Sequence, residues 1–272
     1  MNGKRRSQPR VRLRFGTPHR HYRRTDSTNT RARELAEAGA PDGTVVTASE
    51  QTSGRGRQGR VWNAPPGKAL LYSALLRPLG DRPLLPLAVA LAVCEAAEEL
   101  APHTSCRIKW PNDVWIEERK LAGILIETKV QEDWAIIGVG LNLTISPEEF
   151  PTDLRSPAVS LSDSTERGRE GSRRSHPAVA PAGPLPTLLT AAVALSHHLD
   201  RWIEADPAQV LPAFRERDAL AGREISWSDG PDLEKVSGSG IAAGVDDRGG
   251  LVVTLAGGGS TVLFAGEVHL RL

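Results

Sequence analysis

The sequence predicts an α/β protein with a mixed, largely antiparallel sheet, flanking helices and a small C-terminal all-β barrel. Three features indicate this architecture. Four short apolar stretches follow one another between residues 105 and 143 with only brief polar breaks, which is typical of a strand meander. Apolar stretches of helical length stand before and after them. From residue 222, short β-branched runs alternate with glycine and aspartate turns.

The first predicted elements are a helix, two strands and a second helix. The stretch DSTNTRARELAEAG predicts a helix that Ser27 or Thr28 caps and Gly39 ends. Residues 44–49 are rich in β-branched side chains and predict a strand. KALLYSALL predicts another strand, which Pro78 closes. Residues 84–100 are mostly apolar and predict a buried helix.

The middle of the chain predicts the meander and two further helices. The meander consists of CRIKW, VWIE, LAGILIETK and WAIIGVGLNL, with breaks at PND, ERK and QED. A helix over residues 187–205 follows, with its apolar residues on one face. It carries His197 and His198, which we expect to be polar surface residues. A short helix near AQVLPAFRERD leads to the all-β tail.

Composition divides the chain into an arm, a larger domain and a tail. Residues 1–24 hold nine basic residues and no acidic one, so we expect a solvated, partly disordered arm, with a nucleic-acid contact as the alternative. Residues 25–218 form the larger domain and residues 219–272 the small β-barrel domain. Residues 162–184 contain no Leu, Ile or aromatic side chain, which predicts a disordered insertion.

The overall composition argues against several classes of protein. The net charge is +1, which gives no general attraction to nucleic acid or membranes. The longest apolar run, within residues 84–94, is too short to span a bilayer. No apolar segment of a signal peptide follows the basic start. Cys94 and Cys106 lack metal-binding spacing, so we expect buried thiols in a reducing compartment. These features predict a cytoplasmic protein with no membrane partner.

The stretch GRGRQGR at residues 54–60 is unusually rich in glycine and arginine. It contains the G-x-G-x-x-G spacing of dinucleotide-binding loops, but those loops open into a helix, and RVWNAPPGK follows here. Two prolines and a glycine prevent such a helix. Glycines let a backbone approach a ligand, and arginines bind phosphate or carboxylate. One interpretation is a loop that closes over a bound anion. The other is a flexible basic surface loop or an RNA-contacting segment.

A second polar group is predicted where two strands of the meander meet their turns. KWPND brings Lys109, Asn112 and Asp113 to one turn, and Lys120 opens a nearly all-apolar strand nearby. Two cations, an amide and a carboxylate are therefore expected near one edge of the sheet. Such a set is suited to a polyphosphate with its metal ion and a second anionic reactant.

With these motifs the sequence resembles the biotin protein ligases over about residues 20–272. The motifs occur in the family's order: STN at 27–29, GRGRQGR at 54–60, KWPND at 109–113, KLAGIL at 120–125, GVGLN at 138–142 and AGEVHLR at 265–271. The resemblance implies a class II synthetase-like ligase core as the catalytic domain, with biotin and ATP as substrates and Mg²⁺ as the metal ion. Biotin would form biotinyl-5′-AMP and then pass to a lysine of a biotin carboxyl carrier domain of an acyl-CoA carboxylase.

The resemblance also implies which residues form the site. Lys120 would bridge biotin's carboxyl group and the α-phosphate, Arg57 would retain the intermediate, and Asp113 would hold the metal ion. The expected biotin-binding residues are Ser27, Thr28, Asn29, Gln51, Gly54, Arg55, Arg57, Lys120, Gly123 and Leu125. The expected nucleotide-binding residues are Arg57, Arg60, Lys109, Asn112, Asn142 and Arg271.

The sequence departs from the family pattern at two places. Gln58 stands where another basic or imidazole side chain is common, which lowers the charge of the loop. Some members carry an aromatic residue that stacks on adenine near the stretch that reads RSPAVSLSD here, where this chain has Ala158 and Val159. We therefore expect aliphatic packing, Trp62 or another aromatic residue to hold the base.

Two other functions are alternatives to biotin ligation. A lipoate or octanoyl ligase or transferase with a related core is the first, and the arginine-rich loop and C-terminal barrel favour biotin over it. A nucleic-acid-binding regulator is the second, and the short basic arm has no room for a recognition helix. We therefore expect ligase activity without operator binding. An exposed edge strand would also permit a homodimer.

Overall fold

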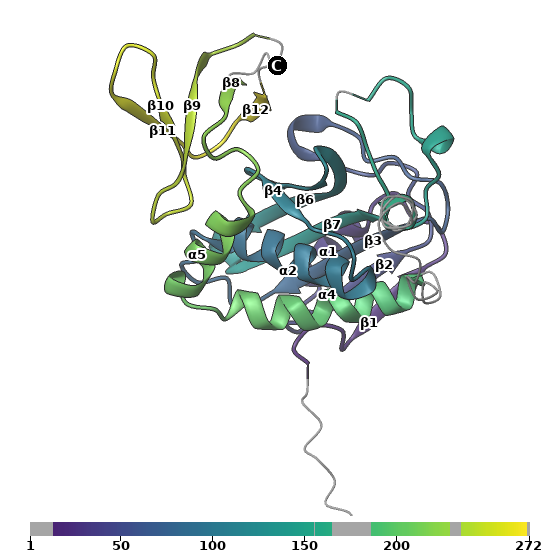
Figure 1. Cartoon of the computed structure of the whole chain (residues 1–272). Coiled ribbons are helices and arrows are strands. Elements are labelled where there is room, and N and C mark those ends of the chain that lie inside the picture. The colour runs from purple at the N-terminus through teal and green to yellow at the C-terminus, as the bar shows by residue number, and fades with distance from the viewer. Residues whose placement is uncertain (1–12, 155, 165–185, 229–234, 271–272) are drawn as a thin grey trace, which may run out of the picture.

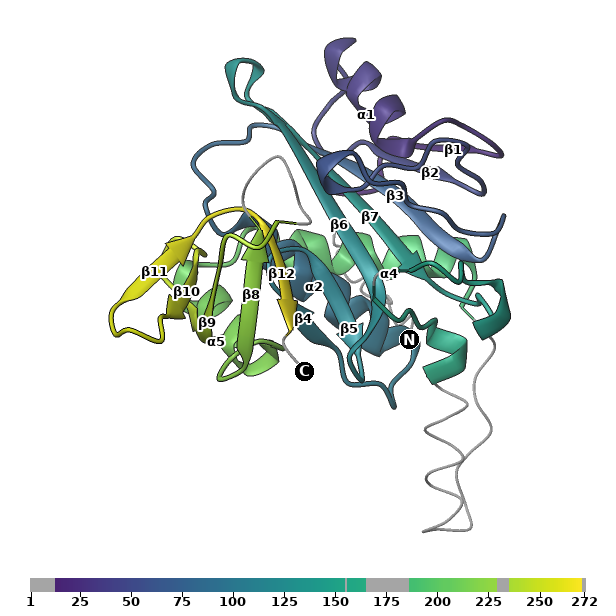
Figure 2. The same cartoon turned by 90° about the horizontal axis from the view of Figure 1, so that it is seen from above.

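The larger part of the chain is built on a seven-stranded sheet with helices on both faces (Figures 1 and 2). This computed structural model describes residues 13–154, 156–164, 186–228 and 235–270. The strand order is β1-β2-β3-β7-β6-β5-β4. β1 runs parallel to β2 and the other neighbouring pairs are antiparallel, so the predicted mixed sheet is confirmed. The strands are β1 (His19–Tyr22), β2 (Val45–Ala48), β3 (Ala69–Leu76), β4 (Arg107–Lys109), β5 (Asp113–Ile116), β6 (Arg119–Lys129) and β7 (Trp134–Asn142).

The predicted meander is confirmed and runs from β4 to β7. Each strand pairs antiparallel with the next, and β7 then pairs with β3. The turn between β5 and β6 places Glu117 and Glu118 at positive φ, 49° and 61°. Two-residue hairpins favour this backbone because it matches the twist of the strands. Short turns of this kind set the register that aligns the polar residues of neighbouring strands.

Different helices cover the two faces of the sheet (Figure 2). α1 (Thr28–Glu37) packs on one face, where its buried alanines lie in a cluster with Trp134 and Ile136. α2 (Leu85–Leu100) and α4 (Leu188–Ile203) form a layer on the other face, with α5 (Pro207–Arg217) beside α2. We call these the α1 face and the α2/α4 face. α2 is apolar on nearly all sides because the sheet, α4 and α5 pack around it.

The segment before residue 25 differs from the expected solvated arm. His19 pairs with Val45 in register, so β1 is an edge strand of the main sheet. Phe15 is 1% exposed and belongs to the main core. The basic composition does not reveal this, because main-chain hydrogen bonds and one aromatic anchor hold the segment. Residues 1–12 lie outside the described residues.

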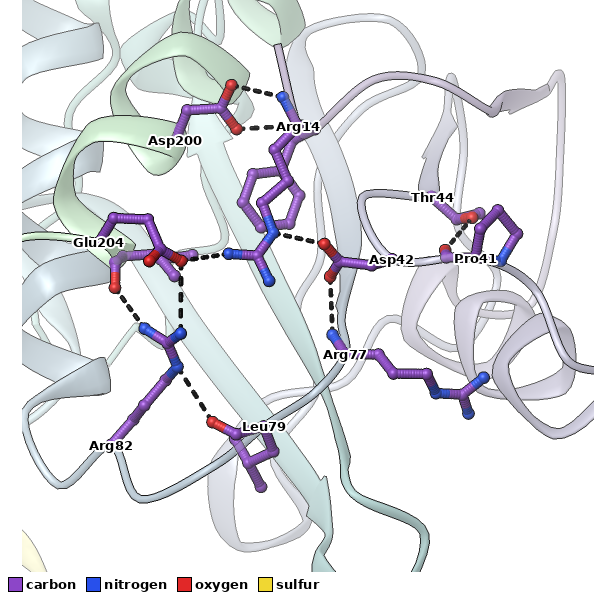
Figure 3. Close-up of polar contacts among 11 residues, drawn as sticks. Arg14, Pro41, Asp42, Thr44, Arg77, Leu79, Arg82, Asp200 and Glu204 are labelled. Carbon is purple, nitrogen blue, oxygen red and sulfur yellow. Dashed lines mark hydrogen bonds and ion pairs between the residues drawn. The ribbon is translucent and has the colours of Figure 1, made fainter. Parts of the chain in front are cut away.

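Arg14 joins this segment to two other parts of the fold (Figure 3). Its backbone N–H donates to Asp200 on α4 at 2.7 Å. Its guanidinium pairs with Asp42 at 2.5 Å and with Glu204, which follows α4. Asp42 also accepts a hydrogen bond from the backbone N–H of Arg77 at 2.7 Å. These contacts connect the start of the described chain to the end of the helical layer.

The C-terminal residues form a second, five-stranded antiparallel sheet, which confirms the predicted small all-β unit. Its order is β11-β10-β9-β8-β12, and no pairing joins β11 to β12 among the residues described. Buried side chains of this sheet, such as Ile225 and Val268, lie in one core cluster with α2. The strands are β8 (Glu224–Ser228), β9 (Gly238–Val245), β10 (Leu251–Thr254), β11 (Ser260–Leu263) and β12 (Glu267–Leu270).

Some sequence predictions fall wholly or partly on residues that are not described. The insertion expected over 162–184 is described only at 162–164, and Arg271 lies outside the described residues. Cys94 and Cys106 are buried free thiols, as expected. No helix in the described part of the chain is both long and apolar enough to cross a membrane.

We expect Phe15→Ala to lower the free energy of unfolding by about 3–5 kcal/mol, because it removes a buried aromatic ring and leaves a cavity. Phe264→Ala is the matched control, since that side chain is 66% exposed and its loss should change stability by only about 0.5 kcal/mol. Urea unfolding followed by circular dichroism measures both. Equal stabilities of the two variants would show that residue 15 does not anchor the segment.

Candidate active site

A row of charged and small residues crosses the α1 face of the sheet. Lys109 on β4 lies opposite Asp113 on β5, and Asp113 lies opposite Gly123 on β6. Gly123 in turn lies opposite Gly140 on β7. Directly opposed residues of antiparallel strands point to the same face. The register therefore places the charges beside a part of the sheet whose own residues have no side chains.

A β-bulge in β6 brings Lys120 into the same row. Regular alternation would point residues 120 and 123 to opposite faces of the sheet. The register between β5 and β6 shifts between Val114 and Trp115, so that Lys120 lies opposite Trp115. A bulge of this kind re-aims a side chain. Lys120 Nζ consequently lies 2.8 Å from Asp113 Oδ1, and the predicted convergence of two lysines and a carboxylate is present.

Lys109 is a largely buried cation, with 7% of its surface exposed. Burial lowers the pKa of its ammonium group, Asp113 raises it, and the charges of Lys120 and Arg60 lower it. Its Nζ also lies 5.1 Å from the centre of the Trp115 ring, which stabilises a cation. A positive charge that has lost much of its water interacts strongly with an anion that enters the site.

Three glycines leave a hollow on the α1 face of the sheet, which we call the glycine hollow. A Cβ at Gly138 would lie 2.2 Å from Asn29 Oδ1, and a Cβ at Gly140 would lie 2.4 Å from Trp62 Cε2. A Cβ at Gly123 would lie 2.9 Å from Trp62 Cζ3. Glycine at these positions therefore lets the indole and the amide lie directly on the strands. Trp62 Nε1 is buried and has no hydrogen-bond partner among the described residues, so it can donate to a ligand.

The start of α1 forms a neutral, polar end of the site. The backbone N–H of Thr28 donates to Gln51 Oε1 at 2.7 Å, and the Thr28 hydroxyl donates to the same oxygen at 3.0 Å. Ser73 Oγ on β3 lies 2.6 Å from Asn29 Oδ1. Ser27 occupies the N-cap position, but its side chain makes no capping hydrogen bond. These groups suit a neutral ligand group with both donors and acceptors.

Arg57 holds the glycine- and arginine-rich loop against the KWPND turn. Its Nη1 donates to Asn112 Oδ1 at 3.1 Å. Burial lowers the pKa of Arg57, and the charge of Asp113 opposes that shift. A guanidinium remains protonated despite such a shift, so Arg57 adds a permanent positive charge beside the row.

Two further arginines connect the loop to distant strands. Arg55 Nη2 pairs with Glu127 Oε1 on β6 at 2.8 Å, and Glu127 also accepts a hydrogen bond from Asn29 Nδ2 at 2.8 Å. Arg60 pairs with Glu267 on β12, in the C-terminal sheet. The loop thus crosses from the α1 end of the site to the second sheet, with one arginine bound at each end.

One pocket is lined by most of the predicted site residues. Gly54 is not in the lining, but a Cβ there would lie 2.1 Å from the Trp62 carbonyl oxygen, so glycine permits a close backbone contact. Trp62, which the sequence suggested as a possible adenine contact, is in the lining. The predicted residues in the lining are Ser27, Thr28, Asn29, Gln51, Arg55, Arg57, Arg60, Lys109, Asn112, Asp113, Lys120, Gly123 and Leu125.

Asn142 lines a neighbouring pocket that shares Lys120 and Trp62 with the first. Its Nδ2 donates to the Val159 carbonyl oxygen at 3.0 Å, which holds the segment around residue 158 against β7. Ala158 and Phe150 also line this pocket. Phe150 is a second aromatic side chain beside Trp62 at this pocket, and no motif in the sequence singles it out. Arg271, which was expected here, lies outside the described residues.

Sequence reasoning also missed Ser73, Glu127 and Glu267. A lone serine in the buried strand ALLYSALL needs a hydrogen-bond partner, and that need is a sign of a polar site. Glu127 is likewise a polar residue directly after the apolar part of its strand, β6, and its carboxylate needs partners. Glu267 lies in the recognised AGEVHLR motif but was not assigned a role. In each case the partner comes from a helix or loop far away in the sequence.

Comparison with known proteins gives the family. A model of the biotin/lipoate A/B protein ligase family matches residues 21–143. The biotin–[acetyl-CoA-carboxylase] ligase of Mycobacterium tuberculosis is 36% identical over 262 residues, which are 91% of this chain and 87% of that protein. The chain belongs to the biotin protein ligase family. That family's ligase/repressor BirA of Bacillus subtilis is 44% identical over 142 residues, but this match covers 43% of BirA, less than half its length.

A solved structure of the same ligase family has the same fold. The biotin protein ligase of Aquifex aeolicus in complex with biotin and ATP aligns with a TM-score of 0.70 and 28% identity. The alignment covers 93% of this chain and 98% of that one. The biotin ligase fold that the sequence resemblance implied is therefore confirmed.

We expect Gly140→Ala to lower the free energy of unfolding by about 1–3 kcal/mol, because the new Cβ overlaps the Trp62 indole. The same change in a Trp62→Ala background should cost less than half as much, since the overlap is gone. A double-mutant cycle measured by thermal unfolding separates the two cases. An equal cost in both backgrounds would mean that the indole does not occupy the glycine hollow.

Proposed function

We propose that the protein is a biotin protein ligase that joins biotin to ATP and then transfers the biotinyl group to a lysine of a carrier protein. The observation that carries the proposal is the division of one pocket into a neutral polar end and a cationic end. The glycine hollow lies beside the lysines. The relatives named as biotin ligases, and the A. aeolicus ligase in complex with biotin and ATP, support it.

The neutral end suits the ureido group of biotin. A urea has one strong acceptor and two donors and carries no charge. The side chains of Ser27, Thr28 and Asn29 present hydroxyl and amide groups to the pocket, and Gln51 and Ser73 hold two of these in place. A polar site of this kind rejects a ligand that lacks the matching groups, because its own buried groups would lose their partners. This argues for biotin over lipoate.

The cationic end suits the reacting groups. Biotin's carboxylate and the triphosphate of ATP repel each other, and Lys109, Lys120 and Arg57 reduce that repulsion. A carboxylate oxygen attacks the α-phosphorus as the bond to pyrophosphate breaks. Lys120, held beside Asp113, is placed to stabilise the charge that develops on the oxygens between them. Holding the two reactants in line can contribute on the order of 7–11 kcal/mol.

The second step needs no nucleophile from this protein. The neutral amine of the carrier lysine attacks the acyl carbon of biotinyl-5′-AMP, the bond to AMP breaks, and the amine loses a proton. The pocket holds the anhydride until the carrier arrives, and the arginine loop excludes water. We infer from the name of the M. tuberculosis relative that the carrier is a biotin carboxyl carrier domain of an acyl-CoA carboxylase.

The residues also fit a Mg²⁺ ion. Mg²⁺ in nucleotide sites is bound by one or two carboxylates together with the phosphates. Asp113 supplies a carboxylate in the pocket, and its buried Oδ1 lies 2.8 Å from Lys120 Nζ. We propose that Asp113 holds the ion, which would neutralise phosphate charge. The expected homodimer and the cytoplasmic location stay predictions.

We expect Lys120→Ala to slow biotin-dependent ATP–pyrophosphate exchange by about 10²–10³-fold, the typical loss when one transition-state donor is removed. Lys129→Ala is the matched control. It lies on the same strand and pairs with Glu132 at 2.7 Å, but it lies at the far end of β6. Its exchange rate should equal that of the unchanged protein. Exchange with lipoate instead of biotin, or none with either acid, would overturn the proposed function.

We expect Arg57→Ala to release biotinyl-5′-AMP more than tenfold faster, because it removes the loop's contact with Asn112. Gln58→Ala, in the same loop, is the control. Release is measured by a chase with unlabelled biotin after the labelled intermediate has formed. An unchanged release rate would show that Arg57 does not retain the intermediate.

A further inference from the structure

Imidazole and carboxylate side chains face each other between α2 and α4. These helices lie side by side in the layer that covers the α2/α4 face, on the opposite side of the sheet from the site (Figures 1 and 2). α2 contributes Glu95 and Glu99, and α4 contributes His197 and His198. One ligand atom from each of Glu99, His197 and His198 lies within 4.8 Å of the others. The sequence shows the two histidines but not the carboxylates opposite them.

His198 is held between two carboxylates. Its Nδ1 lies 3.0 Å from Glu95 Oε2, and its Nε2 lies 2.8 Å from Glu99 Oε2. Arg201 fixes Glu95 with a contact of 2.9 Å. A neutral imidazole has one N–H, so only one of these nitrogens can donate. When Nδ1 donates to Glu95, the lone pair of Nε2 faces an oxygen lone pair of Glu99. Both atoms are then available as ligands of one cation.

The arrangement of Glu95 favours a metal ion. Histidines that bind metals almost always donate their other ring N–H to a carboxylate or carbonyl group, which fixes the tautomer and turns the free nitrogen toward the ion. Glu95 makes this contact with the less exposed histidine of the pair. His197 supplies a third ligand, which a simple proton bridge between His198 and Glu99 does not require. The two ring centres lie 5.3 Å apart.

The ligand atoms can reach metal-binding distances. Nitrogen and oxygen ligands lie about 2.0 Å from Zn²⁺, and hence roughly 3.3 Å from one another in a tetrahedron. A contraction from 4.8 Å needs only side-chain rotation, because Glu99 and His197 are both exposed. His198 can stay in place, because the exposed Glu99 side chain can move its Oε2 from 2.8 Å to roughly 3.3 Å from His198 Nε2.

We propose that Glu99, His197 and His198 bind a divalent transition-metal ion of the Zn²⁺ type, with Glu95 as the group that orients His198. Two imidazoles and one carboxylate form a donor set that suits Zn²⁺, Co²⁺ and Ni²⁺ and that Mg²⁺ does not prefer. The ion joins α2 to α4 and so stabilises the helical layer. It takes no part in the reaction, because the sheet lies between it and the active site.

The test uses full-length protein without an affinity tag, because a histidine tag binds the same ions. Zn²⁺ titration by calorimetry should show one saturable site per chain, and saturating Zn²⁺ should raise the Tm by a few degrees. Co²⁺ should give the absorption spectrum of a nitrogen and oxygen site. His197→Ala and Glu99→Gln change exposed side chains and should each weaken binding at least tenfold. His21→Ala is the control, since His21 belongs to the other histidine pair, at Thr47.

Three results would overturn the proposal. Absence of saturable binding would mean that a proton alone bridges His198 and Glu99. Binding that His197→Ala and Glu99→Gln leave unchanged would place the ion elsewhere. A thiolate-to-cobalt charge-transfer band would assign it to Cys94 or Cys106. None of these results bears on biotin ligation, so the two proposals fail independently.

Discussion

Lys109 and Lys120 share a single carboxylate, Asp113, on a sheet face that is partly closed to water. The row therefore carries excess positive charge, and Arg57 adds to it. Burial lowers the pKa of Lys109, so its charged form is less stable here than in water. Bound anions stabilise the charged form of Lys109. The bulge in β6 places Lys120 in this row and Arg57 lies beside it, so positive charge is concentrated where we propose that two anionic reactants bind.

Much of the fold follows from local features of the sequence. β4 to β7 are joined by brief turns, and each turn fixes the register of the two strands that it joins. For that reason the sequence could predict that Lys109 and Asp113 lie together. The motifs shared with the biotin ligases then identified the residues of the pocket. Nearly all of these residues line it, because the hairpins, the arginine loop and the start of α1 meet on one face of the sheet.

Long-range contacts could not be predicted in the same way. Regular alternation would have placed Lys120 on the face opposite to Gly123, and only the bulge reverses this. Ser73 reaches the site because β3 pairs with β7, a partner far along the chain. β1 contains no apolar run, so nothing in its composition indicates a strand. It forms because β2 offers an open edge and because Phe15 is buried beside it.

The C-terminal sheet takes part in closing the site. Trp110, next to Lys109, donates its indole N–H to the Gly249 carbonyl oxygen at 2.9 Å, which fixes this sheet against the end of β4. Glu267 of the same sheet pairs with Arg60, three residues from Arg57 in the loop. A shift of this sheet would therefore also displace Lys109 and the part of the loop that carries Arg57. The arginine loop, the KWPND turn and the C-terminal sheet are therefore connected by direct side-chain contacts on one side of the site.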